Sequence, residues 1–293
     1  MYRIVQMSAA PPVDRLSALL ERFRVRARLF HEGALCGLSS FEPEPGRGFL
    51  HVLRAGALEV RHARGSGAPA RLRVEQPSLL FYPRPLAHRF ATPDAGSDFV
   101  CAELAFEGGE AHPLVRALPP FLCLPLQRVD GLQDSLALLF RETEQVRCGH
   151  RLLADRLFEV VLLQLLRWLI DHGQIHSGLI AGLADPRLAR ALTAIHEQPG
   201  AAWNLERLAA AAELSRSAFA ERFHRVTGQT PADYLARWRI ALACRGLREG
   251  RPLGLLADEL GYASHSSLSR VFRQIMGRSP RAWLQQSAAD PTE

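Results

Sequence analysis

The chain has 293 residues, of which 47% are hydrophobic and 23% are charged, a composition typical of a globular protein with one or two domains. Its longest apolar run, residues 157–170, contains Gln164 and Arg167 and is too short to span a bilayer. The first residues, MYRIVQMSAAPP, lack the apolar core of a secretion signal, and the five cysteines without close pairing favour a reducing compartment. These features predict a cytoplasmic protein that does not enter a membrane.

A short amphipathic helix is predicted over residues 13–23, and residues 28–107 then have the pattern of β-structure. Apolar-alternating runs are separated there by Pro, Gly, Asp and Ser: ALCGLSSFE, GFLHVLRAGALEVRH, ARLRVEQPSLLFYP and SDFVCAELAF. Many short strands with turns between them predict a small barrel or a double-sheet jelly roll.

From Gly131 onward the apolar period becomes helical, which predicts helices over 131–147 and 150–172. GQIHSGLIAGLADP, which follows them, is typical of a linker, and Pro186 opens the next helix. We therefore expect an α+β multidomain protein with three parts. They are a β-barrel over 1–125, a helical dimerisation or linker region over 126–180, and an all-α domain over 181–293.

Positive charge is concentrated in the last third of the chain. Residues 203–285 contain 13 Arg and 7 Asp or Glu, a net charge of +6, whereas the rest contains 23 residues of each sign. This distribution favours a polyanionic partner for the last third.

The same basic part contains an internal repeat. SRSAFAERFHRVTGQTP (215–231) matches SHSSLSRVFRQIMGRSP (264–280) at both N-terminal serines, a central Phe, the Gly and the final Pro. In each copy a short helix precedes, a serine caps the next helix, and Gly228 or Gly277 ends it. Two short helices joined by a tight turn form a helix-turn-helix, whose second helix can enter the major groove of DNA. One copy alone would suit a plain helical hairpin, but two copies in the only basic part favour DNA binding.

Residues 186–285 resemble the DNA-binding domain of the AraC/XylS family of bacterial transcription regulators. The resemblance rests on WNLERLAAAAELSRSAFAERFHRVTGQTPADYLARWRIALA and LADELGYASHSSLSRVFRQIMGRSPRAW. It implies two helix-turn-helix units joined by a long helix, with two recognition helices in successive major grooves of double-stranded DNA. It also implies RNA polymerase as a partner.

The faces that would meet DNA follow from helix geometry. If the apolar residues of each recognition helix are buried, the opposite faces carry Arg216, Ser217, Ala220, Glu221 and His224 in the first helix, and His265, Ser266, Ser269, Arg270 and Arg273 in the second. Arg270 is the strongest candidate for a bidentate guanine contact, whereas Glu221 would accept from cytosine but repel phosphates. We predict that the second unit carries most of the direct readout. For His265, a role as a cap or phosphate contact is as well supported as a base contact.

The β region offers candidate sensor residues. PRPLAHRF contains His88 and resembles the second motif of cupin barrels, and GFLHVLRAGALEV resembles the first motif without its HxH pair. Period-2 alternation predicts that His51 points into the barrel. With Cys36 and Cys101 on neighbouring runs, the segment resembles the cupin-type sensor of one AraC subfamily, some members of which sense reactive chlorine.

Cys36, His51, His88 and Cys101 form a Cys2His2 set that suits zinc or another thiophilic metal. None of the spacings is a short paired-ligand spacing, so a metal site depends on the barrel bringing all four together. Two alternatives stay open: the four are ordinary core residues, or a cysteine of lowered pKa senses oxidants.

The sequence thus predicts a homodimeric, ligand- or redox-responsive transcription regulator whose barrel senses a small molecule, a metal or an oxidant. The resemblance implies that the helices of residues 126–180 mediate dimerisation. Candidates for the contact are Leu153, Leu157, Val160, Val161, Gln164 and Leu165, and an intramolecular core is the alternative for them. The competing function is a metal-dependent cupin enzyme, an oxygenase or isomerase, fused to a DNA-binding domain. Against it, the usual set of three His and one Glu is incomplete. A DNA-bending protein without a signal would leave the barrel unexplained.

Overall fold

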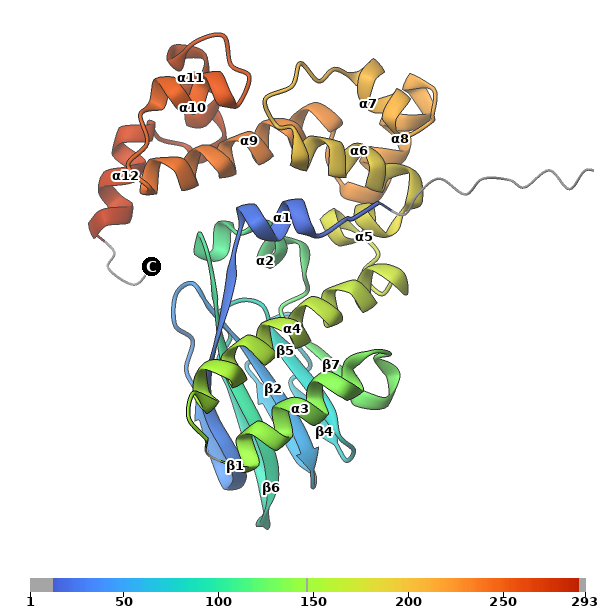
Figure 1. Ribbon diagram of the computed structural model, residues 1–293, viewed down its shortest axis with the longest axis vertical. Helices are drawn as coiled ribbons and strands as arrows, with labels where there is room; N and C mark the ends of the chain where they lie inside the picture. The colour runs from blue at the N-terminus through green and yellow to red at the C-terminus, as the bar shows by residue number, and fades with distance from the viewer. Residues whose placement is uncertain (1–12, 146, 290–293) are drawn as a thin grey trace, which may run out of the picture.

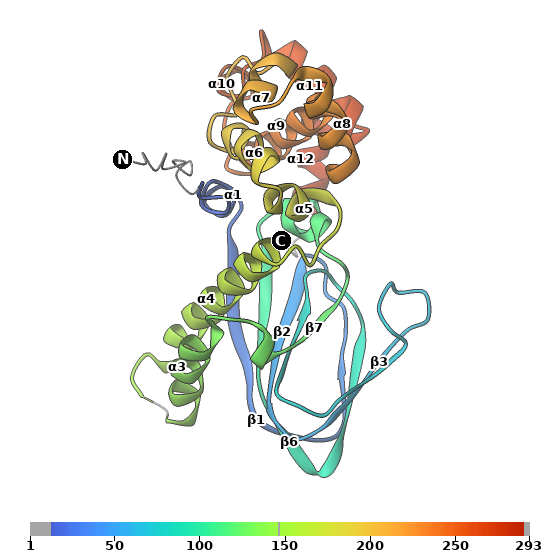
Figure 2. The same cartoon turned by 90° about the vertical axis from the view of Figure 1, so that its right-hand side faces the viewer.

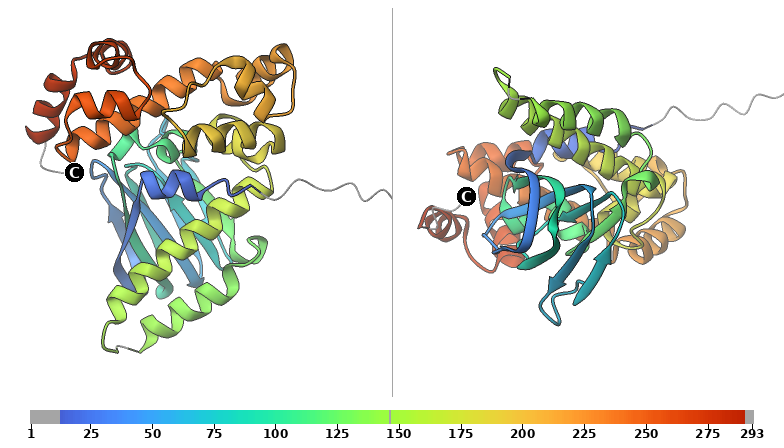
Figure 3. Two further views of the ribbon diagram at one scale, coloured as in Figure 1. Left: turned by 45° about the horizontal axis from the view of Figure 1, so that its top comes forward. Right: turned by 90° about the horizontal axis from the view of Figure 1, so that it is seen from below.

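The computed structural model describes residues 13–145 and 147–289. Its N-terminal half is an antiparallel seven-stranded sheet that curls on itself (Figure 1). The strands are β1 (Val25–Phe41), β2 (Arg47–Ala55), β3 (Leu58–His62), β4 (Arg71–Val74), β5 (Ser78–Tyr82), β6 (His88–Phe106) and β7 (Leu122–Pro125). Their order is β4-β3-β6-β2-β5-β7, and β1 pairs with β6. The curl is seen end-on in the right panel of Figure 3 and confirms the predicted cupin-like fold, as a half-barrel.

Both faces of this sheet are buried, because alternate residues of a strand enter different apolar clusters. In β2, Phe49 and Leu53 belong to the cluster inside the half-barrel, whereas Leu50 and Val52 belong to the cluster on the outer face. His51 therefore points inward, and it is fully buried. The period-2 prediction for this residue is confirmed.

Two antiparallel helices, α3 (Leu132–Glu144) and α4 (His150–Asp171), cover the outer face of the sheet, as Figure 2 shows. Apolar residues of α4 such as Phe158, Val161 and Leu165 are fully buried in the outer cluster. No helix among the described residues is both long and apolar enough to cross a membrane.

The C-terminal part is all helical, as predicted. Its helices are α5 (Gly178–Ala184), α6 (Pro186–Glu197), α7 (Leu205–Ala211), α8 (Arg216–Thr227), α9 (Pro231–Arg248), α10 (Leu253–Glu259), α11 (His265–Met276) and α12 (Pro280–Ala289). The pairs α7–α8 and α10–α11 pack on opposite ends of α9 (Figure 1). An 18-residue helix such as α9 is about 27 Å long, so it sets the spacing of the two pairs.

The two helix-turn-helix units begin and end their second helices as the sequence predicts. The hydroxyls of Ser215 and Ser264 accept hydrogen bonds from backbone N–H groups of the first turns of α8 and α11. Gly228 and Gly277 end these helices in the left-handed conformation, with φ of 74° and 73°.

The stretch predicted to be a linker, residues 173–186, instead contains α5. Leu179, Ile180 and Leu183 of this helix are buried, and α5 packs against α2 (Pro113–Ala117), α4, α6 and α8. The flanking Gly and Ser residues suggested a loop, but burial of the apolar side chains stabilises a short helix that would be marginal alone.

Helix α1 (Ser17–Arg22) lies between the half-barrel and the helical domain, as the left panel of Figure 3 shows. Nη2 of Arg22 donates to the backbone oxygen of Glu197 at 2.9 Å. The ring of Phe23, which follows α1, packs edge-on against Trp238 of α9 with 5.1 Å between centroids. Nε of Arg245, also on α9, lies 3.1 Å from Oε1 of Glu107, which follows β6. These contacts connect the half-barrel directly to the helix that joins the two helix-turn-helix units.

Candidate nucleic-acid interface and sensor residues

The first candidate reading helix, α8, turns its apolar residues inward. Phe219 and Phe223 are fully buried, so Arg216, Ser217 and Glu221 lie on the exposed face. Ala220 is half-buried at the edge of that face. The exposed face of α8 thus carries small or acidic side chains together with Arg216, His224 and Arg225.

The second candidate reading helix, α11, is more polar on its outer face. Leu268 and Phe272 are fully buried beneath it. A shallow hollow on the surface of α11 is lined by His265, Ser266, Ser269, Arg270, Arg273 and Gln274. All five residues predicted for this helix line the hollow. Gln274 was missed, although it follows Arg270 by one helical turn and could have been found by the same spacing.

The two helices differ in how their charges are compensated. On α8, Nη1 of Arg225 lies 3.7 Å from Oε1 of Glu221, and Nε of Arg222 donates to Oδ2 of Asp185 at 2.6 Å. Among the described residues, the guanidinium groups of Arg270 and Arg273 on α11 have no hydrogen-bond or ion-pair partner. The guanidinium donors of α11 are therefore available to an outside acceptor, whereas most of the charge on α8 is already engaged.

In the half-barrel interior, His51 and His88 meet directly. Their Nε2 atoms lie 3.0 Å apart, and Nδ1 of His88 lies 2.8 Å from the backbone oxygen of Leu86. A carbonyl oxygen only accepts, so Nδ1 of His88 carries the proton and its Nε2 accepts from Nε2–H of His51. This assignment leaves Nδ1 of His51 as a bare acceptor, buried without a partner among the described residues.

Burial keeps both rings neutral. It lowers the pKa of His88 to about 4, and, with repulsion from His88, it holds the pKa of His51 well below its ordinary value. Aromatic rings enclose the pair: His88 stacks between Tyr82 and Phe41, with centroid distances of 3.8 Å and 4.8 Å.

Cys101 lies directly opposite His51 on the neighbouring strand, so both face the interior. Cys101 makes no hydrogen bond to either histidine among the described residues. Burial raises the pKa of its thiol well above the ordinary value, so the thiol is protonated at neutral pH. This is the opposite of the lowered pKa that thiol redox sensing requires.

Cys36 does not join the other three residues. It is exposed on β1, because the alternation along this part of the strand turns Leu35 toward the interior and Cys36 away from it. The described residues contain no group of three or more His, Cys, Asp or Glu side chains placed to hold a metal. A zinc site formed by Cys36, His51, His88 and Cys101 therefore does not fit this structure.

Five of the six residues suggested for a dimer contact divide into two groups, and the sixth, Gln164, is half-buried with its Nε2 donating to the backbone oxygen of Gly131 at 2.9 Å. Leu157, Val161 and Leu165 are buried in the chain's own core, which is the intramolecular alternative. Leu153 and Val160 remain on the surface, with exposures of 42% and 41%. Only this second pair is available to a second copy of the chain.

Comparison with known proteins agrees with the two-part architecture. A cupin family matches residues 14–171, more than half of the chain, and a helix-turn-helix domain family matches residues 208–286. A cupin-like half-barrel followed by two helix-turn-helix units defines a class of DNA-binding transcription regulators. The chain belongs to the AraC-type transcription regulators with an N-terminal cupin domain.

Among curated relatives, a putative AraC-like transcription regulator of Streptomyces antibioticus is 39% identical over 171 residues, which is 57% of this chain and 56% of that protein. The chain thus spans little more than half of that relative. The MmsAB operon regulatory protein of Pseudomonas aeruginosa is 30% identical over 82% of this chain and 72% of its own length. The RCS-specific transcriptional activator RclR of Escherichia coli K12 is 28% identical over 83% and 87%.

Two solved structures are also similar. The DNA-binding domain of AdpA in complex with a target DNA is 29% identical and covers 37% of this chain and 98% of its own, with a TM-score of 0.33. Unsaturated fatty acid bound ToxT from Vibrio cholerae is 12% identical, covers 89% and 94%, and has a TM-score of 0.39. At these TM-scores the likeness bears on neither the site nor the effector.

Proposed function

We propose that this regulator binds two adjacent segments of DNA with unequal helices, α11 reading base identity and α8 mainly positioning the domain. The observation that carries the proposal is that the guanidinium groups of α11 have no protein partner among the described residues. Helix α8 packs at the other end of α9, which is about 27 Å long, and most charged side chains of α8 are already paired within the chain. Arg270 is the residue proposed for a bidentate guanine contact. Arg216, Ser217, Ala220 and Glu221 on α8, and His265, Ser266, Ser269 and Arg273 on α11, complete the proposed interface.

The half-barrel is proposed to sense an effector and to change the affinity for DNA. Support comes from the contacts of Phe23 and Glu107 with α9, because α9 also fixes the distance between the two reading helices. An effector that binds one arrangement of these parts more tightly than another shifts the population toward that arrangement. The names of the relatives support regulation, and no observation favours the enzyme alternative.

A homodimer that works with RNA polymerase in the cytoplasm completes the proposal. Leu153 and Val160 are the surface residues of α4 proposed for the dimer contact. Two linked copies would raise the effective affinity for paired sites without any new contact to DNA.

Sequencing of genomic fragments retained by the purified full-length chain tests the DNA-binding proposal. We expect enriched sites with two conserved segments whose centres are about 10 bp apart, the spacing of successive major grooves on one face. Fragments retained without any shared sequence, or with only one conserved segment, would contradict the two-helix proposal.

A further inference from the structure

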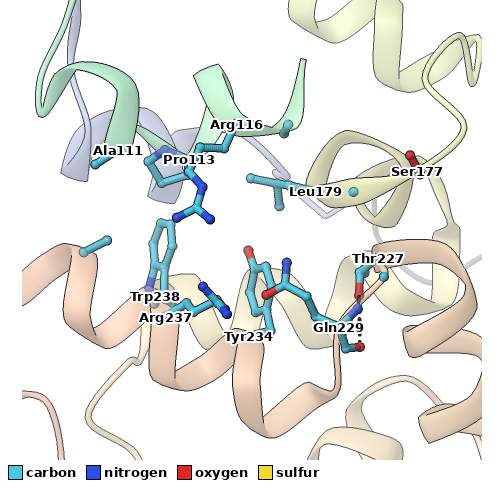
Figure 4. Close-up of a pocket in the computed structure, with 14 residues that line it drawn as sticks. Ala111, Pro113, Arg116, Ser177, Leu179, Thr227, Gln229, Tyr234, Arg237 and Trp238 are labelled. Carbon is cyan, nitrogen blue, oxygen red and sulfur yellow. Dashed lines mark hydrogen bonds between the residues drawn. The ribbon is translucent and has the colours of Figure 1, made fainter. Parts of the chain in front are cut away.

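A cavity of about 320 Å³ lies between the two parts of the chain, outside the half-barrel interior and away from the residues of α8 and α11 proposed to meet DNA. Its lining comes from α2 on the half-barrel side and from α5, α9 and the end of α8 on the helical side, as Figure 4 shows. A second hollow of about 260 Å³ adjoins it and shares Ala111, Arg116, Arg237 and Ala241, but that hollow is also lined by Glu107 and Glu249. The first cavity alone lies at the lower end of the size range of ordinary small-molecule sites.

The cavity is positively charged. Arg116 of α2 and Arg237 of α9 line it, and its lining contains no Asp or Glu among the described residues. Neither guanidinium has a hydrogen-bond or ion-pair partner among those residues. Each guanidinium carries five N–H donors, so the two offer their donors to the cavity without a protein acceptor.

Other arginines at the same junction are engaged. Arg245 forms ion pairs with Glu107 and Glu249. Arg22 donates to a backbone oxygen of α6, and Nη1 of Arg15 donates to the backbone oxygen of Leu183 at 3.1 Å. Arginines that connect the two parts thus have protein acceptors, whereas the guanidinium groups of Arg116 and Arg237 have none among the described residues. This difference points to an acceptor that comes from outside the chain.

Tyr234 supplies a third donor. Its hydroxyl oxygen lies 2.6 Å from Nε2 of His196, whose Nδ1 is buried without a partner among the described residues. A neutral imidazole carries one proton, and a buried N–H without an acceptor is rarer than a bare lone pair. The proton therefore lies on Nε2 and is donated to Tyr234, which leaves the Tyr234 O–H free to donate. Figure 4 shows this hydroxyl and the Arg116 guanidinium directed toward the same space.

The rest of the lining suits the body of an organic molecule. Trp238, Leu179 and Pro113 provide apolar surface next to the two guanidinium groups. Gln229 also points into the cavity, and its Oε1 has no partner among the described residues (Figure 4). Its amide is therefore uncommitted and can accept from a ligand hydroxyl or, after a half-turn, donate to an oxyanion.

We infer that this cavity binds a small organic oxyanion, a carboxylate or a phosphate ester, whose oxygens are held by Arg116, Arg237 and Tyr234. Without the anion, the two positive charges repel each other across the junction, and with it they attract the same group. The ligand would therefore favour the arrangement in which α2 and α9 are close. This consequence for DNA binding rests on the proposed function, whereas the charge of the cavity and its donors do not.

Three probes of similar shape test the inference by ligand-observed NMR titration of the full-length chain: phenylacetate, phenyl phosphate and the neutral phenylacetamide. At least one anion is expected to bind about ten-fold more tightly than the amide, because charge-assisted hydrogen bonds are about twice as strong as neutral ones. Which anion binds better distinguishes carboxylate from phosphate. If both anions bind no more tightly than phenylacetamide, the inference is wrong.

Arg116→Gln and Arg237→Gln should each remove the preference for the anion. Both side chains are exposed, so neither change should alter folding, which thermal unfolding checks. Arg141→Gln is the matched control, since it removes one exposed, unpaired arginine of α3 and should leave the preference intact. Retention of the preference by both cavity variants would overturn the assignment.

DNA binding of the same samples separates this inference from the proposed function. A chain that binds the anion and not DNA would overturn the proposed function and leave the cavity site standing. A chain that binds DNA with no preference for the anions would overturn the cavity site and leave the proposed function standing.

Discussion

Nε2 of His112 donates a hydrogen bond to the backbone oxygen of Phe23, with 3.1 Å between the two atoms. Nδ1 of the same ring accepts from the backbone N–H of Leu114 at 3.1 Å and thereby caps α2. One buried imidazole thus positions both Phe23, which packs on α9, and α2, which carries Arg116. Because Nδ1 accepts and Nε2 donates, the arrangement requires the neutral ring.

The first prediction concerns acid stability. Burial lowers the pKa of His112 to about 4, so below about pH 6.5 the unfolded chain binds a proton that the folded chain does not. The contribution of His112 to the free energy of unfolding is therefore complete above pH 6.5 and should fall by about 2 to 3 kcal/mol on going to pH 4.5.

Urea unfolding at pH 7.5 and pH 4.5 measures this difference. His112→Gln should be less stable than the wild type at pH 7.5 but should lose less stability on acidification. His224→Gln, a change of an exposed histidine on α8, is the control and should follow the wild type. An equal loss on acidification in His112→Gln and the wild type would show that His112 is not held neutral.

The second prediction concerns thiol reactivity. Cys36 is exposed, whereas burial raises the pKa of the Cys101 thiol well above its ordinary value. Because the thiolate is the reactive form, a thiol reagent at pH 7.5 should modify Cys36 in a fast phase and Cys101 only as slowly as the chain opens. Cys36→Ser should remove part of the fast phase, and Cys101→Ser should leave it unchanged. Fast modification of Cys101 would revive oxidant sensing at this residue.

The third prediction concerns the turn of the second helix-turn-helix unit. Gly261 has a φ of 71°, and a Cβ atom there would lie 2.3 Å from the backbone oxygen of Gly200. Gly277 has a similar φ of 73° but open space around the same position. Both Gly→Ala changes should lower the free energy of unfolding by about 1 to 2 kcal/mol, because alanine is strained in the left-handed conformation that glycine adopts freely. Gly261→Ala should lower it by about 1 to 3 kcal/mol more, because the overlap with Gly200 forces the backbone apart.

Thermal or urea unfolding of the two glycine variants measures that difference directly. Because the two positions share their backbone conformation, the comparison isolates the contact between the turn and the loop at Gly200. Equal destabilisation by the two changes would mean that the loop moves away at little cost.

The sequence allowed the helical domain to be predicted in detail, because its signals are local. Ser215 and Ser264 cap the helices that they precede, and the faces of α8 and α11 follow from one apolar period. The sensor residues were predicted less well. Alternation placed His51 correctly, but it was not applied to Cys36, which lies on the opposite side of β1 from the inward-facing Leu35.

The junction between the two parts could not be predicted. Arg116 and Arg237 lie on separate elements, and only the packing of α2 and α5 against the helical domain brings them to one cavity. The helix α5 was itself taken for a linker, because its stability comes from burial and not from helix propensity.

The fourth prediction concerns the unequal reading helices. Arg270 of α11 has no protein partner among the described residues, so its guanidinium can form two hydrogen bonds to one guanine. Arg270→Ala should lose about 1 to 3 kcal/mol of discrimination at one or two base positions. Glu221→Gln, on the exposed face of α8, should change overall affinity more than base preference, because it removes a charge that repels phosphates.

The most direct test of this account is selection of binding sequences from a random DNA library by the wild type, Arg270→Ala and Glu221→Gln, at one fixed salt concentration. The account predicts that Arg270→Ala relaxes one or two positions within one conserved segment and leaves the other segment intact, while Glu221→Gln selects the wild-type sequence. Unchanged selection by Arg270→Ala, or relaxed selection by Glu221→Gln at positions where Arg270→Ala has no effect, would contradict the assignment of base readout to α11.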